Sequence, residues 1–249
     1  MMNRTDEVWK KQDLALAFLE NVRSAIPMAA EQIDIMLRVV RSRVPGDCSF
    51  IDLGCGDGIL GRAIHAMYPQ SVGVLLDFSP SMIEAAREIA GPAGGKLSFI
   101  LGDYASPDWT DTVKGLAPFD LVVSGYSIHH QPDERKQALF REIFNLLKPG
   151  GLFLNLDTVT PQPEWTEELW DNLFIDSLFE FEQRKGSART RDEVAGEWLA
   201  RPDREANILA PLDAQLDWLA EAGFFDIACY FQVLAQALFG GTKPRIPAA

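Results

Sequence analysis

Residues 50–58 read FIDLGCGDG, and this stretch decides the fold. Its first four residues are largely apolar and bounded by turn residues, which predicts a strand buried on both faces of a sheet. Gly54, Gly56 and Gly58 follow, and glycine allows a positive φ and a close approach of a ligand to the backbone. From residue 59 the apolar spacing becomes helical, and a helix N-terminus offers free N–H groups. The stretch therefore predicts a ligand site at the carboxyl end of a strand.

Outward from this turn, strand and helix patterns alternate along the chain. The expected strands cover residues 50–53, 72–76, 97–101, 121–124 and 152–156, and the expected helices cover residues 59–68, 79–90 and 132–147. A final helix over residues 212–221 and two strands over residues 225–232 and 234–239 close the pattern. Such alternation predicts a mainly parallel sheet with helices on both faces, which is the doubly wound, Rossmann-like α/β class.

The departures from this alternation divide the chain into four expected segments. These are an N-terminal helical cap at residues 1–45, a ligand-binding core at 46–157, a helical lid insertion at 158–211, and a C-terminal helix and hairpin at 212–249 that complete the core. The cap and the lid carry the aromatic residues Trp9, Phe18, Trp165, Trp170, Phe174 and Phe179. These rings could line a pocket for a small, partly apolar molecule, or they could form the cores of the two segments.

Composition narrows the possible partners. The net charge is −13, from 23 basic and 36 acidic residues, so the surface repels phosphate backbones and anionic lipids. We therefore expect a small-molecule substrate rather than nucleic acid or membrane, and the oligomeric state stays open, a homodimer included. Three cysteines without CxxC spacing argue against disulfides and metal sites. With neither a signal peptide nor a membrane-length apolar run in the sequence, we expect a cytoplasmic protein.

Two carboxylates are expected beside the glycine turn. Asp77 ends the second strand, where it can accept hydrogen bonds from both hydroxyls of a ribose. Asp103 follows the third strand, where it can accept a hydrogen bond from an exocyclic adenine amine, and Met82 and Tyr104 could cover the faces of the base. Residues 56–61 also fit the dinucleotide pattern GxGxxG, so the turn by itself leaves the cofactor open.

Five ordered motifs decide between the cofactors. They are residues 50–58 (FIDLGCGDG), 75–82 (LLDFSPSM), 102–104 (GDY), 119–124 (FDLVVS) and 146–151 (LLKPGG). The set resembles the class I S-adenosylmethionine-dependent methyltransferases. The resemblance implies a seven-stranded sheet in the order 3-2-1-4-5-7-6 with strand seven antiparallel. It also implies that the cofactor is S-adenosylmethionine and that the product is S-adenosylhomocysteine. The residues implied to bind the cofactor are Asp52, Gly54, Gly56, Gly58, Asp77, Phe78, Met82, Asp103, Tyr104 and Ser124.

The candidates for catalysis follow the fourth and fifth strands. His129 and His130 stand at the mouth of the expected site, and an imidazole titrates near neutrality, so His129 is a candidate general base. Either histidine could instead cap the next helix or pack inside the protein. Asp157 ends the fifth strand and could orient an acceptor amine or hydroxyl, or only cap a turn.

Methyl transfer from S-adenosylmethionine to a small-molecule acceptor is therefore the expected activity. A relative of the carboxy-S-adenosylmethionine synthases, which act in tRNA modification, is an alternative that requires an arginine facing the methyl position, with Arg4 and Arg23 available. A binding protein without turnover is a second alternative. An NAD-dependent dehydrogenase is a third, against which the turn at residues 148–151 and the terminal hairpin argue.

Overall fold

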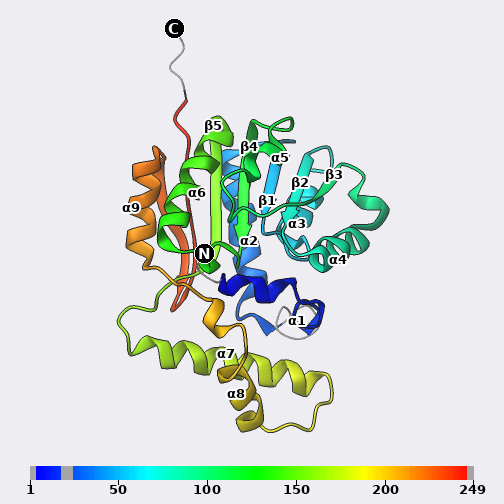
Figure 1. Ribbon diagram of the computed structural model, residues 1–249, viewed down its shortest axis with the longest axis vertical. Helices are drawn as coiled ribbons and strands as arrows, with labels where there is room; N and C mark the ends of the chain where they lie inside the picture. The colour runs from blue at the N-terminus through cyan, green and yellow to red at the C-terminus, as the bar shows by residue number, and fades with distance from the viewer. Residues whose placement is uncertain (1–3, 18–24, 246–249) are drawn as a thin grey trace.

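The fold of the chain is known from a computed structural model, which describes residues 4–17 and 25–245. A seven-stranded sheet in the order β3-β2-β1-β4-β5-β7-β6 runs through its centre (Figure 1). The strands are β1 (Ser49–Leu53), β2 (Val72–Asp77), β3 (Leu97–Leu101), β4 (Phe119–Gly125), β5 (Leu147–Thr158), β6 (Phe225–Val233) and β7 (Gln236–Thr242). β1 to β5 pair in parallel, and β7 pairs antiparallel with both β5 and β6, so the predicted order and the reversal of strand seven are confirmed.

Helices cover both faces of the sheet, as the alternating pattern predicts. They are α1 (Gln12–Ala17), α2 (Ala29–Arg43), α3 (Ile59–Met67), α4 (Pro80–Ala90), α5 (Trp109–Val113), α6 (Asp133–Leu146), α7 (Thr166–Arg184), α8 (Arg191–Leu199) and α9 (Leu212–Ala222). Side chains of α5, α6 and α9 pack on one face, and those of α2, α3 and α4 pack on the other. The pair α7–α8 lies beyond the lower end of the sheet in Figure 1.

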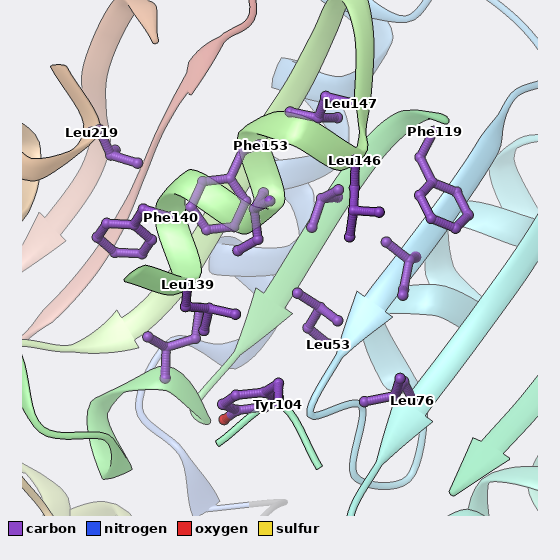
Figure 2. Close-up of a cluster of buried hydrophobic side chains, with 14 of the residues drawn as sticks. Leu53, Leu76, Tyr104, Phe119, Leu139, Phe140, Leu146, Leu147, Phe153 and Leu219 are labelled. Carbon is purple, nitrogen blue, oxygen red and sulfur yellow. The ribbon is translucent and has the colours of Figure 1, made fainter. Parts of the chain in front are cut away.

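Strand β1 shows why its sequence is almost wholly apolar. Successive side chains of a strand point to opposite faces, and here both faces carry helices. Ile51 and Leu53 therefore enter the cluster with α6, while Phe50 enters the cluster with α2 and α3, and all three are fully buried. Figure 2 shows Leu53 and Leu76 beside the ring of Tyr104 in the first of these clusters.

The structure moves some boundaries that the sequence predicts. β5 begins at Leu147, so the turn at residues 148–151 lies within the strand, and β7 begins at Gln236 because Leu234 turns the chain with φ 50°. The short helix α5 was not predicted, because its five residues show no helical repeat. Phe18 and Arg23 lie outside the described residues. Within residues 4–17 and 25–245, no helix has both the length and the apolar character needed to cross a bilayer.

Candidate functional site

A cavity of about 1330 Å³ opens at the carboxyl ends of the central strands. Its wall starts at the glycine turn after β1, continues past the ends of β2, β4 and β5, and reaches helices α7 and α8. Pockets for small ligands usually measure about 300–1,000 Å³. This cavity therefore has room for a nucleoside cofactor and a second small molecule together.

The glycine turn is held open by backbone geometry and by Asp52. Gly54, Gly56 and Gly58 have φ values of 63°, 53° and 78°, a region that glycine adopts at little cost. The buried Asp52 Oδ2 accepts a hydrogen bond from the Gly61 amide of α3 at 2.8 Å, which ties β1 to the helix that follows. No atom lies within 4 Å of where a Gly56 Cβ would stand, so a ligand can approach this backbone closely.

Asp77 lines the cavity at the end of β2 and also stabilises the turn. Its Oδ2 accepts from the Gly56 amide at 2.9 Å, and its Oδ1 accepts from the Ser79 amide at 2.8 Å. An ionised carboxylate has about four acceptor positions, so about two stay free for a ligand. Burial, opposed by these backbone amides, raises the pKa of Asp77 to about 6. The helix expected from residue 79 begins at Pro80, and the hydroxyl of the preceding Ser79 contacts Ser81 and does not cap it.

Asp103 lies at the end of β3 and is held by the N-terminal segment. Arg4 donates to its two oxygens, Nη1 to Oδ2 at 2.6 Å and Nη2 to Oδ1 at 3.2 Å. Arg4 also pairs with the buried Asp6, a contact that no motif of the sequence indicates. The guanidinium lies 5.9 Å from the centre of the Phe78 ring. The first residues of the described chain therefore close over the β2–β3 side of the cavity.

The ten predicted cofactor-binding residues fall into two groups. Those that line the cavity are Asp52, Gly54, Gly56, Asp77, Phe78 and Met82. Those outside its lining are Gly58, Asp103, Tyr104 and Ser124. Ser124 is fully buried and donates to the Leu53 carbonyl at 2.7 Å, while Tyr104 packs in the core and bonds Ser127 through its hydroxyl at 2.6 Å. The hydroxyl of Ser124 and the ring of Tyr104 are thus held inside the protein, whereas the Asp103 side chain is partly exposed, and the cofactor contacts of all four residues stay predictions.

His129 lines the cavity, and the buried Asp157 pairs with it from inside the protein. His129 Nδ1 lies 2.5 Å from Asp157 Oδ1, and the His129 amide donates to Asp157 Oδ2 at 3.0 Å. Attraction to His129 and several hydrogen bonds overcome burial and lower the pKa of Asp157. Because an ionised carboxylate only accepts, Nδ1 carries the proton and Nε2 is the basic nitrogen. The sequence placed both residues at the cleft but did not predict their contact.

His130 differs from His129 in its environment. Its Nδ1 lies 3.0 Å from the Ala206 carbonyl, and its ring packs against those of His129 and Trp9. Burial lowers the pKa of His130 to about 3, so the ring is neutral at physiological pH. A carbonyl accepts, so this Nδ1 also carries a hydrogen, and His130 joins the loop at residues 128–130 to the end of the lid.

The segment predicted as a lid, residues 158–211, contributes aromatic side chains to the cavity. Trp170 and Phe174 of α7 line it, and Phe174 stacks on Trp198 of α8 with ring centres 4.0 Å apart. Trp165 is 69% exposed and does not line the cavity. The predicted aromatic residues thus serve both purposes that the sequence left open, because Trp170 and Phe174 belong to the lid's own core and also face the cavity.

Comparisons with known proteins agree with this topology. Residues 50–151 match the family described as methyltransferase domain. Residues 50–151 are a methyltransferase domain of the class I S-adenosylmethionine-dependent type. The cofactor of this superfamily is S-adenosylmethionine.

Relatives within the methyltransferase superfamily differ in what their names describe. The chain is 23% identical to the carboxy-S-adenosyl-L-methionine synthase of Chromohalobacter salexigens over 90% of this chain and 78% of that protein. It is 30% identical to the demethylmenaquinone methyltransferase of Leptospira interrogans over 56% of this chain and 55% of that protein. Human N-acetylserotonin methyltransferase, solved with S-adenosylmethionine, has the same fold, with a TM-score of 0.64, 16% identity and coverage of 98% of this chain and 59% of that one. The chain thus spans little more than half the length of the last two proteins.

The residues around the glycine turn fit S-adenosylmethionine. Asp52, Asp57 and Asp77 give this end of the cavity a negative charge, which suits a sulfonium cation better than a pyrophosphate. Asp77 keeps acceptor positions for ribose hydroxyls, and the open space beside Gly56 allows the amino-acid part of the cofactor to approach the backbone. Asp103 has less capacity for an adenine amine, because Arg4 and the Ala105 amide already donate to it.

Replacing Gly54 by alanine should disrupt this end of the cavity. A Cβ at this position would lie 1.8 Å from Ser127 Oγ, and the φ of 63° is strained for any residue with a side chain. Left-handed strain costs about 1–2 kcal/mol before the clash is counted. We expect a lower melting temperature and weaker S-adenosylhomocysteine binding, measured by thermal unfolding and calorimetry. Gly46→Ala is the control, because open space surrounds that glycine; equal effects of the two changes would contradict the expectation.

The pKa of Asp77 predicts how cofactor binding depends on pH. The carboxylate form accepts ribose hydroxyls best, and the folded pKa is about 6. S-adenosylhomocysteine affinity should therefore rise about tenfold between about pH 5 and about pH 7. The pKa of Asp77 is higher in the folded protein than in the unfolded chain, so the folded state holds this proton more tightly. The ligand-free protein should therefore lose stability as the pH rises from about 4 to about 6. Calorimetric titrations across this range measure the first effect, and a flat profile would contradict it.

Proposed function

We propose that the chain transfers a methyl group from S-adenosylmethionine to a hydroxyl group of a small acceptor, with His129 as general base. The observation that carries the proposal is that His129 lines the cavity that also contains the glycine turn and is held there by the buried Asp157. S-adenosylmethionine, when bound, supplies an electrophilic methyl group on a sulfonium sulfur. What the acceptor needs from the protein is removal of its proton at the moment it attacks.

The geometry of the pair suits proton removal. Asp157 accepts the Nδ1 hydrogen, so His129 Nε2 is left as the basic nitrogen for an acceptor hydroxyl. The neighbouring carboxylate also stabilises the imidazolium that forms when Nε2 takes the proton, which is the role of an aspartate in hydrolytic triads. With this proton held on His129, the acceptor oxygen would bond to the methyl carbon as the bond from that carbon to sulfur breaks and S-adenosylhomocysteine leaves.

The lid supports this chemistry by excluding water. We propose that residues 158–211 cover the acceptor and that their aromatic side chains Trp170 and Phe174 bind its apolar part. The end of the lid is bonded to the histidine loop, since the Ile208 amide donates to the His129 carbonyl at 2.9 Å. The two ends of the lid are joined where the Thr160 amide donates to the Ala210 carbonyl at 3.0 Å. Lid position and His129 position are therefore mechanically joined.

Mass spectrometry tests the proposal. The protein is incubated with S-adenosylmethionine that carries a deuterated methyl group and with the small molecules of a cell extract. The proposal predicts a deuterated methyl ether that forms with wild-type protein and not with heat-denatured protein. Labelled RNA or protein in place of a small molecule would contradict it.

A second function has an observation in its favour. The similarity to the Chromohalobacter carboxy-S-adenosyl-L-methionine synthase extends over 90% of the chain, whereas the similarity to the Leptospira demethylmenaquinone methyltransferase extends over 56%. That function requires an arginine facing the methyl position. Of the two candidates, Arg4 lies within the described residues, and it pairs with Asp6 and Asp103. Three further described arginines line the cavity, and each is paired with a carboxylate: Arg189, Arg201 and Arg204.

The bound nucleoside distinguishes the two functions. Protein saturated with S-adenosylmethionine and cell extract is denatured, and the released nucleoside is weighed by mass spectrometry. S-adenosylmethionine and S-adenosylhomocysteine support methyl transfer, whereas a nucleoside heavier by a carboxyl group in place of a hydrogen would support the second function.

A further inference from the structure

Two buried glutamines and a tyrosine form a hydrogen-bonded network on the α2 side of the cavity, and this network takes no part in the chemistry proposed above. Gln32 of α2, Tyr126 after β4 and Gln236 at the start of β7 all line the cavity. Gln32 and Gln236 are 1% and 0% exposed, so their polar atoms need partners inside the protein or from a ligand. These residues are far apart in the sequence, and only the fold brings them together.

The hydrogen bonds of this network fix the orientation of the two glutamine amides. The Pro27 carbonyl can only accept, so the Gln32 atom 2.9 Å away from it is the donor Nε2. Gln32 Oε1 then accepts from the Tyr126 hydroxyl at 2.6 Å. The second hydrogen of Gln32 Nε2 goes to Gln236 Oε1. Gln236 must therefore turn its own Nε2, with two hydrogens, away from Gln32.

Gln236 Nε2 is left as a buried donor. Among residues 4–17 and 25–245, no protein atom accepts a hydrogen bond from it. Leaving such a group unsatisfied is costly, and buried polar groups of this kind in native proteins usually meet a partner. Gln236 belongs to the cavity lining, so a donor that the protein has oriented but left without a partner there is suited to an oxygen atom of a ligand.

The position of Gln236 indicates which ligand that is. Its register partner on β5 is Thr158, directly after Asp157, so it lies at the same strand end as the catalytic pair. Side chains alternate between the two faces of a strand, and on β5 Leu156 packs on the sheet face covered by α2, while Phe153 packs on the face covered by α6. Thr158 and its register partner Gln236 therefore lie on the α2 face, and Asp157 lies on the α6 face. Next to Gln236, Ala235 packs in the aromatic lid cluster with Trp170 and Phe174. The donor thus belongs to the acceptor's part of the cavity.

We infer that Gln236 recognises a second oxygen of the methyl acceptor, and that the acceptor is an aromatic or similarly apolar ring compound with a carbonyl or carboxylate oxygen besides the hydroxyl that is methylated. This inference rests on the proposed function. The ring packs against the lid aromatics, the hydroxyl meets His129 from one side of β5, and the second oxygen accepts from Gln236 Nε2 on the other side. Gln32 acts on the acceptor only through Gln236, as a positioning residue.

A pair of phenols that differ in one oxygen tests the inference. Protein saturated with S-adenosylhomocysteine is titrated by calorimetry with meta-hydroxyacetophenone and with meta-ethylphenol, which share a ring, a hydroxyl and a two-carbon chain. We expect wild-type protein to bind the ketone at least about tenfold more tightly, the effect of one good hydrogen bond to a buried donor. Equal affinities for the two phenols, or binding of neither, would overturn the inference without any variant being made.

Variants assign the effect to Gln236. Gln236→Met keeps the length of the side chain and removes the donor, and Gln236→Leu serves if the first variant does not fold. In either, the affinity ratio should fall close to one while S-adenosylhomocysteine affinity stays unchanged. Gln215→Met is the matched control, because Gln215 is also buried but donates to the Ala210 carbonyl away from the cavity; it should keep the wild-type ratio. A retained ratio in Gln236→Met, or a loss of cofactor affinity there, would overturn the inference.

The readouts separate this inference from the proposed function. His129→Gln should keep the affinity ratio and lose transfer of a deuterated methyl group to the ketone. If the ratio is seen but wild-type protein methylates neither phenol nor any hydroxyl compound, the proposed function fails and recognition of the oxygen stands. If hydroxyl compounds are methylated without regard to a second oxygen, the inference fails and the proposed function stands.

Discussion

Replacing Asp77 by alanine should abolish S-adenosylhomocysteine binding at micromolar concentrations. The change removes the acceptor positions that face the cavity, and hydrogen bonds to a charged group contribute about 1.5–3 kcal/mol each. It also removes the carboxylate that accepts from the Gly56 and Ser79 amides, so the glycine turn and the start of α4 lose their common anchor. Two ribose hydroxyl bonds together correspond to an affinity loss of about a hundredfold to ten-thousandfold.

Calorimetry on the purified variant measures this effect, and two controls make it specific. Asp77→Asn keeps one carbonyl oxygen and should bind detectably but without the pH dependence that the wild-type carboxylate gives. Asp111→Ala removes an exposed carboxylate of α5 that does not line the cavity, and it should bind like wild type. Unchanged affinity in Asp77→Ala would refute the ribose-binding role.

Replacing His129 by glutamine should remove most of the turnover and leave cofactor binding intact. A positioned general base accelerates proton transfer by about a hundredfold to ten-thousandfold, and glutamine cannot take a proton at neutral pH. His129 is held at the cavity wall by Asp157, and neither residue belongs to the glycine turn. We therefore expect kcat for any identified acceptor to fall by this factor and S-adenosylhomocysteine affinity to stay within about twofold.

Asp157→Asn and His130→Gln complete the experiment. Asparagine at position 157 weakens the hold on the Nδ1 hydrogen and should lower kcat in the same direction. Because Asp157 is buried and accepts four hydrogen bonds, its variant is also checked by thermal unfolding. His130→Gln should affect kcat less than His129→Gln, since His130 bonds the lid backbone at Ala206. Equal losses in the two histidine variants would contradict the assignment of the base.

The fold and the cofactor end of the site could be predicted because their signals are local. Buried parallel strands leave continuous apolar runs, and the turn after β1 needs three glycines with positive φ within five residues. Asp77 was identifiable because a residue that directly follows a strand of a parallel sheet must lie at the ligand-binding edge. Each of these inferences needs only a few neighbouring residues.

The rest of the site depends on contacts between distant residues. Arg4 meets Asp103 across 99 positions, and Gln32 meets Gln236 across 204. His129 and Asp157 were both placed at the cleft, yet their contact depends on how the loop after β4 packs against β5. No periodicity or spacing in one sequence specifies such pairs. Ser124 shows another limit of local reasoning, since a spacing does not say whether a hydroxyl at a strand end turns inward to a neighbouring carbonyl, as this one does.

Calorimetric titration of wild-type protein with S-adenosylhomocysteine and, separately, with NAD tests the central claim most directly. The acidic wall around the glycine turn, with Asp77 open to a ribose, predicts saturable one-to-one binding of S-adenosylhomocysteine and none of NAD. Binding of NAD without binding of S-adenosylhomocysteine would contradict the account.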